Sequence, residues 1–130
     1  MNNTIRTILN ENQSTSLYEE DNVVIGVCKC NYANNKITIV SWFVEKDYRH
    51  LGIGKELLHD CIKSIIEKHK IDEIEYIWNG MNGYVKTWLD HFDAVCNCPI
   101  QVLKNTCEDS WDNHIYRLND EKLLKYLNLR

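Results

Sequence analysis

The sequence predicts a mixed α/β (α+β) domain in which helices flank a mostly antiparallel central sheet. Three observations lead to this prediction. Strand-like segments follow one another early in the chain, an amphipathic helix comes next, and a half-buried strand follows that helix. The length of 130 residues suits one domain. We therefore expect a single domain at 1–130, with its core at about 16–118 and a helical tail at 119–130.

The first part of the chain is rich in β-branched and aromatic residues that are interrupted by turn residues. The expected strands are 4–9, 16–20, 23–30 and 36–44. Asp21-Asn22 and Asn34-Asn35 are turn-forming pairs, so the last three of these strands should form two hairpins in succession.

The pattern changes after Gly54, where apolar residues recur with the spacing of an amphipathic helix. This helix should end near His69, where basic side chains suit the negative end of the helix dipole. The remaining expected elements are a strand at 73–78, a short helix from Asn82 to Phe92, strands at about 94–104 and 113–118, and a helix at 120–127.

The overall charge excludes some functions. A formal net charge of −4 disfavours a nucleic-acid-binding domain and suits a cationic acceptor. The sequence has no run of about 20 apolar residues, which a membrane helix would need, and its first residues do not resemble a secretory signal. We therefore expect a cytoplasmic protein with no membrane partner.

Six cysteines raise the alternatives of disulfides, a metal site and buried thiols. Cys28-x-Cys30 and Cys96-x-Cys98 would each place two thiols on one face of a strand, but structural zinc usually has two or more residues between paired ligands. We therefore predict reduced structural thiols and no metal, with Cys61 on the apolar side of the long helix.

Two glycines mark the junction between strand 36–44 and the following helix. Gly52 and Gly54 allow the backbone to turn sharply and present N–H groups at the positive end of the helix dipole, which favours phosphate binding. The third glycine of a dinucleotide-binding fingerprint and the Gly-Lys-Ser/Thr of a P-loop are both missing.

Arg49-x-x-Gly52-x-Gly54, between a strand and an amphipathic helix, resembles the acyl-CoA signature of the GNAT superfamily, although Lys46 replaces a frequent proline. The resemblance implies that acetyl-CoA binds here. Backbone N–H groups from Leu51 through Lys55 would hold the pyrophosphate, Arg49 would reach a phosphate or shape the loop, and pantetheine would pair with the preceding strand. The residues implied are Phe43, Val44, Arg49, His50, Leu51, Gly52, Ile53, Gly54, Lys55 and Asn82.

Catalytic groups are less well marked. The family often uses a tyrosine to protonate the leaving thiolate, but the matching place here holds Thr87 or Trp88, which leaves Tyr84 as the candidate acid. Glu45 at the strand exit is the candidate base, and Asp47, His50 and His91 are the other candidates. Each of these residues also has an ordinary structural interpretation, as a packed ring or a solvated charge.

Members of the family usually have two helices between the first two strands, and here that pair is shortened or absent. The acceptor side would be open, which suits a large acceptor or a second copy of the chain packed through the apolar tail, as in a homodimer. The predicted function is acetyl transfer from acetyl-CoA to a small-molecule or protein amine. The alternative is a non-catalytic acyl-CoA sensor or regulatory module of the same fold.

Overall fold

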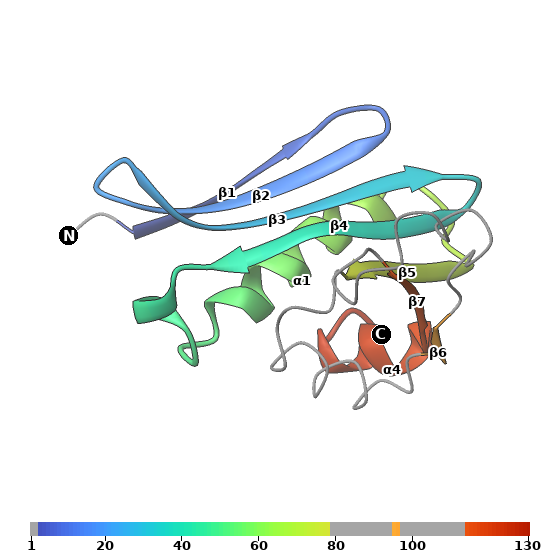
Figure 1. The fold of residues 1–130 in the computed structure, drawn as a ribbon. Coiled ribbons are helices and arrows are strands. Elements are labelled where there is room, and N and C mark those ends of the chain that lie inside the picture. The colour runs from blue at the N-terminus through green and yellow to red at the C-terminus, as the bar shows by residue number, and fades with distance from the viewer. Residues whose placement is uncertain (1–2, 79–94, 97–113) are drawn as a thin grey trace, which may run out of the picture.

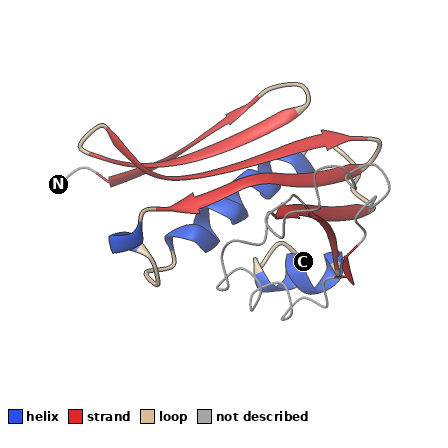
Figure 2. Cartoon of the chain, in the orientation of Figure 1, coloured by secondary structure: helices blue, strands red, loops and turns tan. Residues whose placement is uncertain are grey.

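The computed structural model describes residues 3–78, 95–96 and 114–130. The strands are β1 (Asn3–Leu9), β2 (Gln13–Glu20), β3 (Val23–Ala33), β4 (Lys36–Val44), β5 (Glu73–Trp78), β6 (Val95–Cys96) and β7 (His114–Leu118). The helices are the short η1 (Lys46–Tyr48), α1 (Ile53–Ile66) and α4 (Asp120–Tyr126). Within the described ranges, the strands form one sheet in the order β1-β2-β3-β4-β5-β7-β6, with α1 and α4 on one side of it (Figure 1, Figure 2).

The antiparallel meander from β1 to β4 confirms the predicted hairpins. Asp21 and Asn22 both have positive φ angles, and so do Asn34 and Asn35. Two left-handed residues in a two-residue turn match the twist of the flanking strands, which explains why these short polar pairs occur here. β1 continues into β2 through residues 10–12, so the predicted absence of a helix pair between the first two strands is confirmed.

The second half of the sheet is mixed. α1 connects β4 to β5, which pairs parallel to β4, and β7 then pairs antiparallel to both β5 and β6. The predicted strands at 73–78 and 113–118 are confirmed as β5 and β7. The predicted strand at 94–104 is described only at β6, and the predicted helix from Asn82 to Phe92 lies outside the described residues. In the part of the chain that the structure covers, no helix has the length and apolar character to cross a bilayer.

The hydrophobic core of the described residues lies between the sheet, α1 and α4. α1 buries the face formed by the side chains Ile53, Leu57, Leu58, Cys61, Ile62 and Ile65. α4 is capped at its start by Asn119, whose side chain accepts a 3.0 Å hydrogen bond from the N–H of Lys122. Leu123, Leu124 and Leu127 of the tail join the same core. These leucines are therefore buried within this chain rather than presented to a partner.

Candidate functional site

β4 and β5 diverge at their carboxyl ends. Pairing between them runs from Lys36 opposite Glu73 to Ile39 opposite Tyr76, whereas both strands continue beyond these pairs (Figure 1). The cause lies on the other side of β4, where Ser41 pairs with Lys29 and Ile39 pairs with Cys30. Val40 is thus the extra residue of a β-bulge, which bends the strand where it leaves β5.

The main chain at the end of β4 is oriented by its neighbours. The N–H of Glu45 donates to the carbonyl of Ile25 in β3 over 2.8 Å. Because peptide groups alternate along a strand, the N–H and C=O of Val44 point to the opposite side, toward the divergence. Of the two residues predicted to meet pantetheine, Val44 therefore presents its main chain there, while Phe43 presents a ring that is 47% exposed.

The loop after β4 turns through η1 and then through two residues with positive φ angles, His50 at 66° and Gly52 at 84°. α1 begins directly afterwards at Ile53. Gly52 is the N-cap of α1, and no side chain accepts a hydrogen bond at this cap. The first N–H groups of a helix have no carbonyl partner within the helix, so here they form a concentrated site of positive potential. Such an arrangement suits a phosphate group.

Arg49 holds the start of this loop against the strand. Its Nε donates to the carbonyl of Val44 over 2.8 Å, and its guanidinium carbon lies 5.6 Å from the centre of the Phe43 ring. Of the two roles predicted for Arg49, the geometry favours shaping the loop. Lys55 is oriented by α4, since its Nζ lies 4.2 Å from the centre of the Tyr126 ring.

Trp42 connects β4 to the start of α1. Its Nε1 donates to the carbonyl of Gly54 over 2.8 Å, and its ring meets Tyr76 of β5 edge-on at 6.1 Å between centroids. A Cβ atom at Gly54 would lie 3.5 Å from Trp42 Nε1, so this glycine faces the sheet. Sequence reasoning missed Trp42, because the only signal was its alternation within a strand.

Gly26 of β3 permits the close approach of α1. A Cβ atom there would lie 2.9 Å from Cδ1 of Leu57 and 3.2 Å from the carbonyl oxygen of Phe43. Leu57 is fully buried, so it has little room to move away. Gly26 and Trp42 together fix the distance between α1 and the end of β4.

The structure describes only some of the candidate catalytic residues. Glu45 is exposed directly after β4, beside the loop, and Asp47 is exposed within η1. Tyr84 and Asn82, like His91, lie outside the described residues. The hydroxyl of Tyr48 lies 3.4 Å from Oε1 of Glu20, whose negative charge raises the pKa of this phenol. The phenol of Tyr48 therefore stays protonated at neutral pH. Tyr48 was not predicted as a site residue, although it immediately precedes Arg49 in the sequence.

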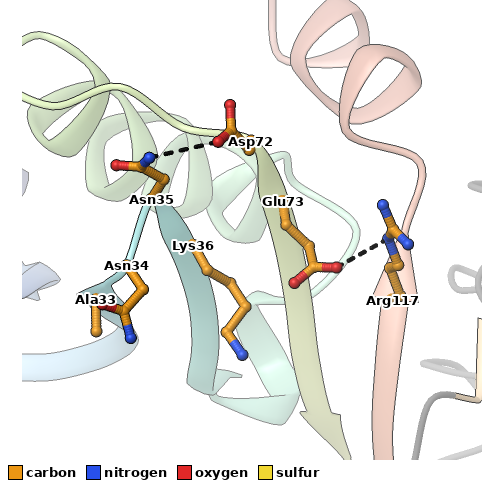
Figure 3. A pocket seen from close by; sticks show the side chains of 7 residues that line it. All are labelled: Ala33, Asn34, Asn35, Lys36, Asp72, Glu73 and Arg117. Atoms are coloured by element: carbon orange, nitrogen blue, oxygen red, sulfur yellow. Dashed lines mark hydrogen bonds and ion pairs between the residues drawn. The ribbon is translucent and has the colours of Figure 1, made fainter.

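A pocket of about 480 Å³ opens at the other end of β4 and β5 (Figure 3). Its lining residues are Ala33, Asn34, Asn35, Lys36, Asp72, Glu73 and Arg117. Polar groups there engage one another, as in the ion pair of 3.1 Å between Glu73 and Arg117 and the hydrogen bond of 3.4 Å between Asn35 and Asp72. The pocket is therefore a surface feature separate from the divergence and its loop.

Comparison with known proteins connects this geometry to a family. The model of the acetyltransferase (GNAT) family matches residues 3–83. No curated protein matches the sequence. A GNAT family acetyltransferase from Elizabethkingia anophelis, with acetyl-CoA bound, superposes with a TM-score of 0.61 at 14% identity over 90% of this chain and 97% of its own. A GNAT family acetyltransferase from Staphylococcus aureus gives 0.63 at 22% identity over 82% and 66%.

The PaiA N-acetyltransferase of Thermoplasma acidophilum, in complex with coenzyme A, superposes with a TM-score of 0.60 at 18% identity. This alignment covers 82% of the chain but only 60% of the length of that protein. The family match spans the meander, the divergence, the loop and α1, which is more than half of the sequence. The chain therefore belongs to the acetyltransferase (GNAT) family.

Proposed function

We propose that the protein transfers an acetyl group from acetyl-CoA directly to an amine. The observation that carries this proposal is the position of the start of α1, whose free N–H groups suit a phosphate, directly beside the divergence of β4 and β5. Coenzyme A and acetyl-CoA occupy the similar proteins named above. In this chain, N–H groups of residues 51–55 would hold the pyrophosphate, and the main chain of Val44 would pair with an amide of pantetheine.

The proposed reaction proceeds within a complex of donor and acceptor. The neutral amine nitrogen attacks the thioester carbonyl, a C–N bond forms, and the C–S bond breaks as coenzyme A leaves as a thiolate. The amine loses one proton, and the thiolate gains one. Glu45 is the proposed base, acting through water because it lies at the exposed strand exit, and Tyr84 is the proposed acid.

The acceptor site is proposed to be open. The short connection between β1 and β2 leaves out the helix pair that the resemblance implied over the acceptor side. This favours a protein amine or a bulky small molecule as the acceptor. A second copy of the chain is the other proposed cover for the open acceptor side. Among the described residues, Cys28, Cys30 and Cys61 are free thiols, which suit the reducing cytoplasm as the proposed place of the reaction.

The second candidate is a sensor that binds acyl-CoA without turnover. The open acceptor side favours it, because binding of the donor needs only the loop, β4 and α1. The departure at Thr87 and Trp88 from the family pattern supports it from the sequence.

Turnover separates the two functions. We expect the purified chain with acetyl-CoA and a panel of polyamines, aminoglycosides and peptides to release coenzyme A and to form an acetylated product with at least one acceptor, measured by chromatography and mass spectrometry. Glu45→Gln should lower kcat by about 10² or more, which is the usual contribution of a general base, while leaving donor binding unchanged. Binding of acetyl-CoA with no product from any acceptor would instead identify the sensor.

A further inference from the structure

Three cysteine side chains converge in the core between α1 and the sheet. Cys28 and Cys30 lie two residues apart on β3, and Cys61 faces them from α1. All three residues are completely buried, and their sulfur atoms lie within 4.8 Å of one another. Cys61 comes from a distant part of the sequence, so the spacing of the strand cysteines did not predict the group.

The surroundings of these sulfurs are polar for a protein core. Ser14 and Ser16 of β2 are also completely buried. The hydroxyls of Ser14 and Ser64 lie 2.6 Å apart. As a thiol, Cys61 donates to the carbonyl of Ser14 over 3.1 Å. Aliphatic side chains would fill this layer without needing such partners, so packing alone does not account for a cluster of small polar groups.

The distances suit a single metal ion. A metal–sulfur bond of about 2.3 Å places the sulfurs of a trigonal or tetrahedral site roughly 3.8 to 4.0 Å apart. The upper limit of 4.8 Å between the sulfurs of Cys28, Cys30 and Cys61 leaves only a small contraction to close such a site. Rotation of the cysteine χ1 angles and a slight approach of α1 to β3 can supply it.

We propose that Cys28, Cys30 and Cys61 form a three-sulfur site for one Cu(I) ion. Thiolates favour Cu(I) and Zn(II) among the biological metals, and zinc almost always takes four ligands. Within residues 3–78, 95–96 and 114–130, the group of possible metal ligands around this point contains these three cysteines alone. Cu(I) accepts three sulfurs, so it needs no fourth ligand at this point. Binding replaces the thiol protons, which are released to solvent.

Cys96 does not complete the site. Cys96 belongs to β6, and the sheet order places β4, β5 and β7 between β3 and β6. With neighbouring strands about 4.8 Å apart, the two strands are separated by roughly 19 Å. The four-cysteine arrangement considered from the sequence therefore does not form.

The test uses the full chain with Cys96→Ser, Cys98→Ser and Cys107→Ser as its reference, so that only the buried group remains. Cu(I) is added in the absence of oxygen, which keeps it reduced. Because the sulfurs are buried, it is supplied both to the folded protein and during refolding from urea. We expect one Cu(I) per chain in competition with bathocuproine disulfonate, a sulfur-to-copper absorption band in the ultraviolet, and a higher Tm.

Cys61→Ser in this reference should lower the Cu(I) affinity at least about 100-fold, which corresponds to about 2.7 kcal/mol. Cys30→Ala is the second variant, in case the serine is not tolerated, and circular dichroism checks that each variant is folded. The proposal is overturned if the reference chain binds no Cu(I), if Cys61→Ser and Cys30→Ala bind it as well as the reference does, or if Zn(II) displaces Cu(I). The test is independent of acetyl transfer.

Discussion

Gly52→Val should weaken acetyl-CoA binding about tenfold or more and lower the free energy of unfolding by about 1–2 kcal/mol. Gly52 has a φ angle of 84°, which glycine adopts freely and a β-branched residue strongly resists. Valine would force the loop to rearrange, and the first N–H groups of α1 would no longer point to a common centre. Isothermal calorimetry gives the affinity, and urea unfolding gives the stability.

Gly52→Asn is the matched control. Asparagine tolerates the left-handed conformation better than other side chains, and a Cβ atom at this position meets nothing within 4 Å. The asparagine variant should therefore stay within a few-fold of the wild type, although it also adds a side chain. Equal loss in both variants would indicate a steric effect, and wild-type binding by Gly52→Val would show that the cofactor binds elsewhere.

Gly54→Leu should reduce acetyl-CoA affinity and stability about as much as Gly52→Val does, but for a different reason. A side chain at residue 54 points at Trp42 and at Cγ2 of Val44. Leucine would displace the indole that donates to the Gly54 carbonyl, move the start of α1, and lower the stability by about 1–3 kcal/mol. Affinity for acetyl-CoA should fall with it, and tryptophan fluorescence should report the displaced ring.

Gly54→Ala distinguishes this mechanism from a block of the backbone surface. Its Cβ would lie 3.5 Å from Trp42 Nε1 and 3.6 Å from Val44 Cγ2, which are ordinary contacts. We expect nearly wild-type affinity and stability. A large loss of binding in the alanine variant, with the fold intact, would mean that the face of residue 54 touches the cofactor directly.

Local chemistry made much of the fold predictable. Asn34 and Asn35 can adopt positive φ angles, so their turn and the strand after it were placed correctly. The end of α1 was predicted too late, near His69. The helix ends at Ile66, and the N–H groups of Lys68 and His69 after it both donate to the carbonyl of Ile65. Such a compact end depends on backbone geometry that basic side chains alone do not reveal.

The loop residues of the candidate site stand out in the sequence, but the contacts that support them do not. Gly52 and Gly54 stood out because a strand gives way to a helix around them. The bond from Arg49 to Val44, the bulge at Val40 and the contact between Trp42 and Gly54 depend on how β4 lies against β3 and α1. A sequence pattern carries no record of that packing. The inward direction of residue 54, toward Trp42 and Val44, likewise depends on this packing.

We propose that the pyrophosphate of acetyl-CoA rests on the start of α1. The most direct measurement is a titration of ¹⁵N-labelled protein with coenzyme A, followed by two-dimensional NMR. We predict that the amide signals of residues 51–55 shift most and saturate together, because their N–H groups would bind the phosphate oxygens. Saturable shifts centred elsewhere, or none at millimolar coenzyme A, would contradict the claim.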